Sequence, residues 1–243
     1  MQAAAQPAAT SSDGRWRLEA GEPASLVLRD AAGHAVRTWP AAALDGSRPS
    51  AVADLRDNPP RRSFLASFAT LPELWEISYD PSAEPIFDGL VHDYRMGEGI
   101  ARSGFLGVRR IPLEAPPTVL AITGQGRHVL ASTPAGDGRV TLDVVHLDVR
   151  RRIARVPLQV TPAAGTTALF LREGRELFAV GGPEGLQVVD LAANRVVRTL
   201  PLGAVRSVRS EPGAQRLEIG VERDGVAATV RVDQRTLEPV SGS

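Results

Sequence analysis

Residues 186–202, LQVVDLAANRVVRTLPL, contain the pattern that decides the fold. A β-branched run ends in an aspartate, a short polar turn follows, and a second β-branched run begins at an arginine. Two antiparallel strands joined by a tight turn have this pattern. Related stretches occupy residues 143–158 (DVVHLDVRRRIARVPL) and 228–240 (ATVRVDQRTLEPV), and their aspartates lie 42 and 43 residues apart, at Asp148, Asp190 and Asp233.

Another hairpin precedes each of these stretches, at residues 119–133, 168–182 and 206–221, and each turns on a glycine near an arginine. A weaker copy of the aspartate pattern, with Asp30, occupies residues 25–41. Four short strands every 40–45 residues or so are the period of a β-propeller blade. The sequence therefore predicts an all-β fold, a β-propeller-like array of about five four-stranded blades. We expect one such domain over residues 15–240, after a disordered lead-in over residues 1–14.

Residues 61–80, RRSFLASFATLPELWEISYD, fit this array as the two inner strands of the second blade. Asp80 then takes the position of the repeated aspartate, for which we expect hydrogen bonds to backbone amides in a turn. Trp75 and Tyr79 are four residues apart, so on a strand they share a face. We expect both rings to pack between blades.

Composition excludes several classes of protein. The 243 residues are 43% hydrophobic, which supports a buried core, and 28 basic against 28 acidic residues give no bulk attraction to nucleic acid. The absence of cysteine excludes disulfides, thiolate catalysis and a c-type haem attachment. The sequence contains no run of eighteen apolar residues and therefore predicts no membrane span. The first residues lack the features of a signal peptide, so the chain is either cytoplasmic or begins after a removed leader.

Few residues carry chemistry by themselves, and we predict no catalytic residue and no metal site. The four histidines, His34, His92, His128 and His146, are scattered singly rather than at zinc-ligand spacing. His92, within GLVHDYR, is the best candidate for a ligand or general acid, whereas His34 lies in a glycine turn facing solvent. His128 and His146 fall in strands of one blade and could approach each other. The arginines at 109–110 and 150–152 indicate either a solvated blade edge or a site that binds the carboxylates of a tetrapyrrole.

Residues 58–110 resemble the cytochrome D1-type propeller proteins, most specifically in the run ELWEISYDP…GLVHDY, and residues 144–158 resemble them more loosely. That family includes the haem d1 domain of dissimilatory cytochrome nitrite reductase and relatives in haem d1 assembly. The resemblance implies an eight-bladed propeller, a denitrification setting, a periplasmic location and haem d1 as cofactor. If haem d1 binds, the candidate residues are His92, Arg95, Arg109, Arg151 and His146.

The chain departs from the family in two respects. In its stretch VTPAAGTTALF, residues 160–170, Thr161, Pro162 and Gly165 match a T-P-H-P-G-like motif, but Ala163 replaces the histidine that reaches the haem pocket. An alanine methyl neither ligates iron nor donates a proton, and about five blades form an incomplete array beside eight. The sequence thus favours a non-catalytic accessory or binding module with a protein partner and no cofactor. The alternatives are a haem d1-binding protein, in biosynthesis, transfer or nitrite reduction, and a fragment that pairs with a second copy or a missing half.

Overall fold

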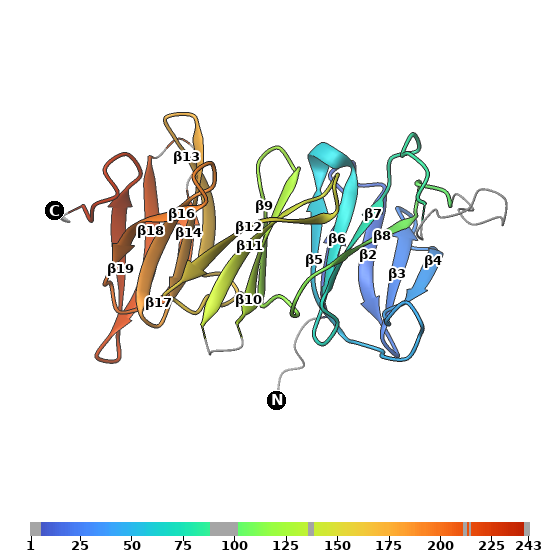
Figure 1. Cartoon of the computed structure of the whole chain (residues 1–243), viewed down its shortest axis with the longest axis horizontal. Helices are drawn as coiled ribbons and strands as arrows, with labels where there is room; N and C mark the ends of the chain where they lie inside the picture. The colour runs from blue at the N-terminus through green and yellow to red at the C-terminus, as the bar shows by residue number, and fades with distance from the viewer. Residues whose placement is uncertain (1–5, 88–101, 136–138, 211–212, 214, 241–243) are drawn as a thin grey trace. The chain divides into compact units, whose positions relative to one another are not determined.

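Five antiparallel sheets make up the fold, four with four strands and one with three (Figure 1). The computed structural model describes residues 6–87, 102–135, 139–210, 213 and 215–240. Within these ranges the only helical element is a 3-10 turn, η1, at Pro59–Arg61, and no helix is long and apolar enough to cross a membrane. The all-β prediction is confirmed, except that the last sheet has three strands instead of four.

The strands follow one another through the sheets in chain order, so that each sheet is a meander of neighbouring strands. The first two sheets are β1 (Ala8–Thr10), β2 (Trp16–Gly21), β3 (Ser25–Asp30) and β4 (Ala35–Pro40), then β5 (Val52–Asn58), β6 (Ser63–Phe68), β7 (Glu73–Ser78) and β8 (Val108–Pro112). The third and fourth are β9 (Val119–Ile122), β10 (His128–Pro134), β11 (Val140–His146) and β12 (Arg151–Leu158), then β13 (Thr167–Arg172), β14 (Arg175–Gly182), β15 (Gly185–Asp190) and β16 (Arg195–Leu200). The last is β17 (Ala204–Ser210), β18 (Arg216–Arg223) and β19 (Val226–Asp233).

The chain divides into two compact units. Unit 1 comprises Met1–Pro116 with the turn Leu147–Arg151, and unit 2 comprises Pro117–His146 and Arg152–Ser243. The single domain over residues 15–240 stays a prediction. The disordered lead-in over residues 1–14 is corrected in part, because β1 lies inside it and pairs with β2, Ala8 opposite Glu19.

The repeated aspartates all lie at or just after the third strand of their sheets. Asp30, Asp80, Asp190 and Asp233 each accept hydrogen bonds from backbone amides two to four residues further on, at 2.8–3.0 Å. These bonds favour the charged carboxylate, and the pKa values of Asp30, Asp80 and Asp233 are accordingly below the ordinary value. The predicted turn role is therefore confirmed for these four residues. Asp148 instead forms an ion pair with Arg61.

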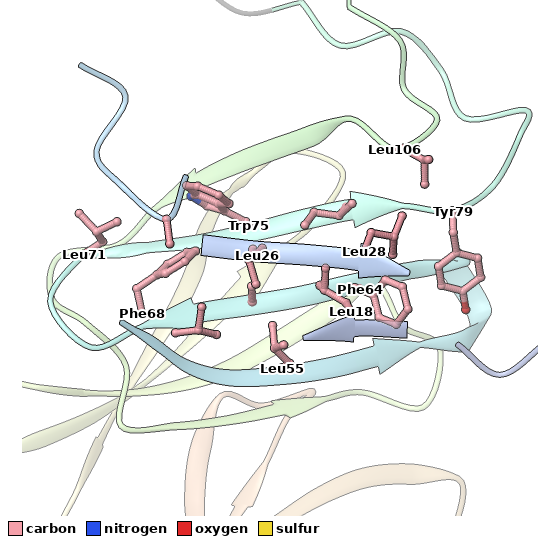
Figure 2. Close-up of a cluster of buried hydrophobic side chains, with 14 of the residues drawn as sticks. Leu18, Leu26, Leu28, Leu55, Phe64, Phe68, Leu71, Trp75, Tyr79 and Leu106 are labelled. Atoms are coloured by element: carbon pink, nitrogen blue, oxygen red, sulfur yellow. The ribbon is translucent and has the colours of Figure 1, made fainter. Parts of the chain in front are cut away.

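The core of unit 1 lies between its two sheets (Figure 2). The hairpin of β6 and β7, predicted as inner strands, occupies the centre of its sheet. Its rings pack in pairs, Phe68 with Trp75 at 4.6 Å between centroids and Phe64 with Tyr79 at 5.1 Å. Trp75 and Tyr79 both belong to the cluster that joins this hairpin to leucines of β2 and β3, so their predicted position between sheets is confirmed.

Unit 2 has two apolar clusters. One joins the sheet β9–β12 to the sheet β13–β16, with Leu130 and Leu142 against Phe178 and Val180. The other joins β13–β16 to β17–β19 in the same way. Within each unit, every sheet buries a face against a sequence neighbour, which is how propeller blades are stabilised.

Ionisation of the Tyr79 hydroxyl is expected to make unit 1 less stable at alkaline pH. Burial is the main cause that raises the pKa of Tyr79 to about 12, and its hydrogen bond to Asp57, 2.8 Å long, acts in the same direction. The unfolded chain loses the Tyr79 proton near pH 10 whereas the folded chain keeps it. Stability from Tyr79 is therefore fully present below about pH 10 and falls between about pH 10 and 12.

We expect the urea midpoint of the wild type to drop more between about pH 9 and about pH 11 than that of Tyr79→Phe. Tryptophan fluorescence reports this unit selectively, because Trp16, Trp39 and Trp75 all belong to it. Equal drops for both proteins would show that the hydroxyl is not buried as described.

Candidate functional site

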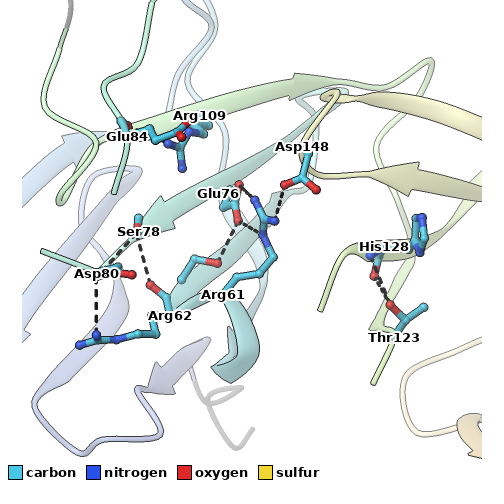
Figure 3. A network of polar contacts seen from close by, with 11 residues as sticks. Arg61, Arg62, Glu76, Ser78, Asp80, Glu84, Arg109, Thr123, His128 and Asp148 are labelled. Carbon is cyan, nitrogen blue, oxygen red and sulfur yellow. Dashed lines mark hydrogen bonds and ion pairs between the residues drawn. The ribbon is translucent and has the colours of Figure 1, made fainter. Parts of the chain in front are cut away.

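The predicted cofactor residues are divided between the two units. Arg109 lies on β8 of unit 1 and donates from Nη2 to the carbonyl of Glu84 at 2.9 Å (Figure 3). Arg151 begins β12 and is exposed, and His146 ends β11 in unit 2. His92 and Arg95 lie outside the described residues. The roles predicted for these five residues stay predictions.

His146 and His128 form a pair at one end of the hairpin β10–β11. The two residues are direct partners in the strand register, and their rings meet edge to face with centroids 4.8 Å apart. The prediction that they approach each other is confirmed. Both side chains are half-buried. Two imidazole rings thus lie side by side at this end of the sheet.

His128 also lines a groove of about 900 Å³, which we call the unit-2 groove. The groove lies between the sheets β9–β12 and β13–β16, both in unit 2. Its walls are apolar side chains from β9, β11, β12 and β13, namely Ile122, Val144, Ile153, Leu169, Phe170 and Leu171. Its polar residues include His128, Arg175, Glu176 and Asn194. An apolar cleft with a few converging polar groups is the usual form of a small-molecule site.

Hydrogen bonds hold the turns that border the unit-2 groove. Glu176 Oε1 accepts from the backbone amide of Gly124 at 2.5 Å, which ties the β9–β10 turn to the start of β14. The backbone of His128 is fixed in turn by the hydroxyl of Thr123, which lies 3.2 Å from both its N and its O (Figure 3). Gly126 and Gly174 have φ of 71° and 77°, the left-handed conformation that these turns need. The groove is therefore preformed on rigid elements.

A cluster of guanidinium groups adjoins the unit-2 groove. Arg175 lines both the groove and a hollow of about 240 Å³, which Arg172 and Arg195 also line together with the carboxylates of Glu173 and Asp190. Three guanidinium groups thus face two carboxylates there. Our sequence reading missed these arginines because it followed runs of adjacent basic residues. The signal was the glycine-arginine pair at 174–175, which repeats the pair at 126–127 one hairpin earlier.

Other arginines, among them Arg152 of the predicted run 150–152, hold buried carboxylates. Arg155 donates to Asp143 from Nε and Nη2, at 2.7 and 3.1 Å, and Arg152 lies 3.8 Å from the same carboxylate, which is only 1% exposed. Both belong to β12, the outer strand of its sheet. In unit 1, Arg61 bridges Glu76 and Asp148 in the same manner (Figure 3). These contacts indicate bracing of sheets rather than ligand binding.

The loop that contains Ala163, where the family resemblance predicts a histidine, connects β12 to β13. Thr166 Oγ1 accepts from the Ala163 amide at 3.0 Å and lies 2.8 Å from the carbonyls of Ala163 and Gly181. Ala163 is exposed and does not line the unit-2 groove. In the part of the chain that the structure describes, no three His, Cys, Asp or Glu side chains are grouped to hold a metal ion.

Comparison with known proteins identifies relatives that match nearly the whole of this chain over part of their own length. No family model matches the sequence. The dihydro-heme d1 dehydrogenase of Pseudomonas aeruginosa is 29% identical over 239 residues, which are 95% of this chain and 43% of that protein. The solved structure of dihydro-heme d1 dehydrogenase NirN in complex with DHE matches with a TM-score of 0.76 and 25% identity, over 96% of this chain and 46% of that one. The chain thus spans less than half the length of these relatives.

Two further solved structures resemble the chain in fold alone. The Dos1 propeller has a TM-score of 0.62 at 10% identity, and Kuenenia stuttgartiensis hydrazine synthase has 0.57 at 11%. The match to the Dos1 propeller covers 96% of this chain and 59% of that one. The match to hydrazine synthase covers 94% of this chain and 62% of that one. The predicted propeller-like fold is confirmed by these matches.

Proposed function

We propose that this chain, a divergent and shortened homologue of dihydro-heme d1 dehydrogenase with a cytochrome D1-type propeller fold, binds a haem d1-type tetrapyrrole without transforming it. The relative's name states an action on dihydro-heme d1, and its solved structure is a complex with DHE. The observation that carries the proposal for this chain is the unit-2 groove, with apolar walls, a histidine and an adjoining arginine cluster.

The residues of the unit-2 groove suit the parts of such a ligand. A tetrapyrrole is flat and largely apolar, and its volume is within the range of clefts near 900 Å³. Leu169 and Leu171, on β13, face this volume from one sheet and Ile153 from the other. Aliphatic walls would exclude water from both faces of the ring and contribute most of the binding free energy.

The polar groups supply the remaining interactions. His128 would provide an imidazole for the haem iron, and His146, whose ring meets the His128 ring edge to face, would restrict how that ring turns. Arg175 would bind a peripheral carboxylate, and Arg172 and Arg195 stand in the adjoining hollow for a second one. Of the candidates predicted from sequence, only His146 takes part in this arrangement.

The absence of catalysis is the second part of the proposal, and it rests on the family resemblance, in which Ala163 takes the place of a histidine that reaches the haem pocket. We expect dihydro-heme d1 incubated with the protein and an electron acceptor to show only the immediate spectral shift of binding, with no slower conversion to the spectrum of haem d1. A protein partner, a periplasmic location and a denitrification setting, which the family resemblance implies, are part of the same proposal.

Substitutions in the unit-2 groove test the binding proposal by visible absorbance titration with haem d1. Leu171→Asp places a carboxylate on an apolar wall at a position already 65% exposed, so the fold should persist while affinity falls at least about tenfold. Arg175→Gln should weaken binding by about tenfold through the lost ion pair. His128→Ala should change the shape of the bound spectrum. His34→Ala, an exposed histidine of unit 1, is the matched control. If all three groove variants titrate as the wild type does, haem d1 does not bind in the unit-2 groove.

A further inference from the structure

A second hollow, in unit 1, combines arginine and tryptophan side chains. It encloses about 400 Å³ between β4, the last strand of the first sheet, and β7–β8 of the second. We call it the Arg–Trp pocket. Its polar and aromatic lining is Arg37, Trp39, Trp75, Arg102, Ser103 and Arg110. Of these residues, the sequence indicated only Arg110 as a possible ligand-binding group, as part of the run 109–110.

Strand geometry brings the lining residues together. Arg37 and Trp39 are two residues apart on β4 and therefore share a face, and the guanidinium carbon of Arg37 lies 5.6 Å from the Trp39 ring centroid. Trp75 and Arg110 are direct partners across β7 and β8, with the guanidinium 4.3 Å from the Trp75 centroid. Both guanidinium groups thus lie over an indole ring at cation–π distance, which favours these positions of the two side chains.

Hydrogen bonds fix the two guanidinium groups further. Arg110 donates from Nη1 to the carbonyl of Ala42 at 3.0 Å and to Glu73 at 3.2 Å. Arg37 donates from Nη1 to the carbonyl of Leu106 at 2.9 Å. Among the described residues no hydrogen bond engages the Nη2 atom of either arginine. Each therefore keeps donor capacity while one of its nitrogens is anchored.

The charge of the Arg–Trp pocket is positive. Arg37 and Arg110 contribute two guanidinium groups, and Glu73, which pairs with Arg110, is the one carboxylate beside them among the described residues. Glu73 Oε2 already accepts from Trp75 Nε1 at 2.8 Å as well as from Arg110. A pocket with excess positive charge and fixed, flat donors favours an anion that accepts coplanar hydrogen bonds.

We infer that the Arg–Trp pocket binds a small aromatic carboxylate. The carboxylate would accept hydrogen bonds from the guanidinium edges, and the aromatic ring would pack against Trp39, Pro40 and Val108. A volume of about 400 Å³ holds a molecule of one or two rings and is too small for a tetrapyrrole. The inference concerns unit 1 alone and does not depend on tetrapyrrole binding in unit 2.

Benzoate is the probe for this site, followed by quenching of tryptophan fluorescence and by calorimetry. We expect saturable binding that weakens about tenfold in Arg37→Gln and in Arg110→Gln, since each loses a charge-assisted bond. Arg17→Gln, an exposed arginine of β2 outside the pocket, is the matched control and should bind as the wild type does. Arg37→Gln changes a side chain of an exposed strand, so it keeps the test valid if Arg110→Gln is unstable.

Inorganic phosphate distinguishes a planar carboxylate site from a general anion site. We expect phosphate to compete poorly with benzoate, because it has no ring to pack against Trp39. Absence of saturable benzoate binding, equal competition by phosphate, or equal weakening by Arg17→Gln would each overturn the assignment.

Discussion

Arg61→Ala is expected to lower the free energy of unfolding of unit 1 by about 3–5 kcal/mol. The reason is Glu76, whose carboxylate is 1% exposed and accepts from Arg61 Nε at 2.7 Å and from Nη2 at 3.3 Å. Without Arg61, the one remaining side-chain hydrogen bond to this carboxylate among the described residues is that from the neutral hydroxyl of Ser63, at 3.0 Å. A buried charge without its counter-ion destabilises strongly. Urea unfolding followed by tryptophan fluorescence measures the effect.

Two controls separate the buried pair from the exposed one. The double substitution Arg61→Ala with Glu76→Gln should recover much of the loss, because it removes the uncompensated charge. Asp148→Asn should cost less than about 1 kcal/mol, since the Asp148 carboxylate is half exposed and its ion pair with Arg61 is screened by water. An Asp148→Asn effect as large as that of Arg61→Ala would contradict this assignment of roles.

Phe64→Ala should lower the free energy of unfolding of unit 1 by about 3–5 kcal/mol, because it leaves a cavity between the two sheets. Phe64 is fully buried and packs against Tyr79 in the cluster of Figure 2. Phe87→Ala makes the same chemical change at a ring that is 53% exposed, and should stay within about 0.5 kcal/mol of the wild type. Urea unfolding of both variants checks the difference. Similar losses for the two would mean that Phe64 is not part of the core.

The strands and their pairing were predictable because the signals are local. Alternation in residues 186–190 and the following polar turn fix one hairpin without knowledge of the rest of the chain. The aspartates at the third strands could be placed for the same reason, since their hydrogen bonds reach only two to four residues ahead. The expectation that His128 and His146 could approach each other came from the same hairpin, and the strand register pairs them directly.

Features that depend on contacts distant in sequence could not be predicted. Asp148 has the sequence position of a turn aspartate, yet it pairs with Arg61, 87 residues earlier in the chain. β1 has only three small residues, too few for a strand signal, and is recognised only by its pairing with β2. The last sheet has three strands because the described residues after β19 form an isolated bridge, Val232 with Pro239, and no longer ladder. Proline lacks the amide needed to continue a ladder.

The unit-2 groove and the Arg–Trp pocket could not be predicted for a related reason. Arg175 and Leu171 come from one sheet and His128 from another, so only the stacking of sheets shows that they line one groove. Arg37 and Arg110 likewise meet only because β4 and β8 lie on the same side of unit 1. Sequence reasoning found residue types with the right chemistry but grouped them by adjacency along the chain.

Titration of the purified protein with haem d1, followed by visible absorbance and with haem b as the control, tests tetrapyrrole binding most directly. We predict a saturating shift at one haem d1 per chain, at concentrations where haem b produces none. A flat titration with haem d1, or an equal and non-saturating response to both haems, would contradict binding in the unit-2 groove.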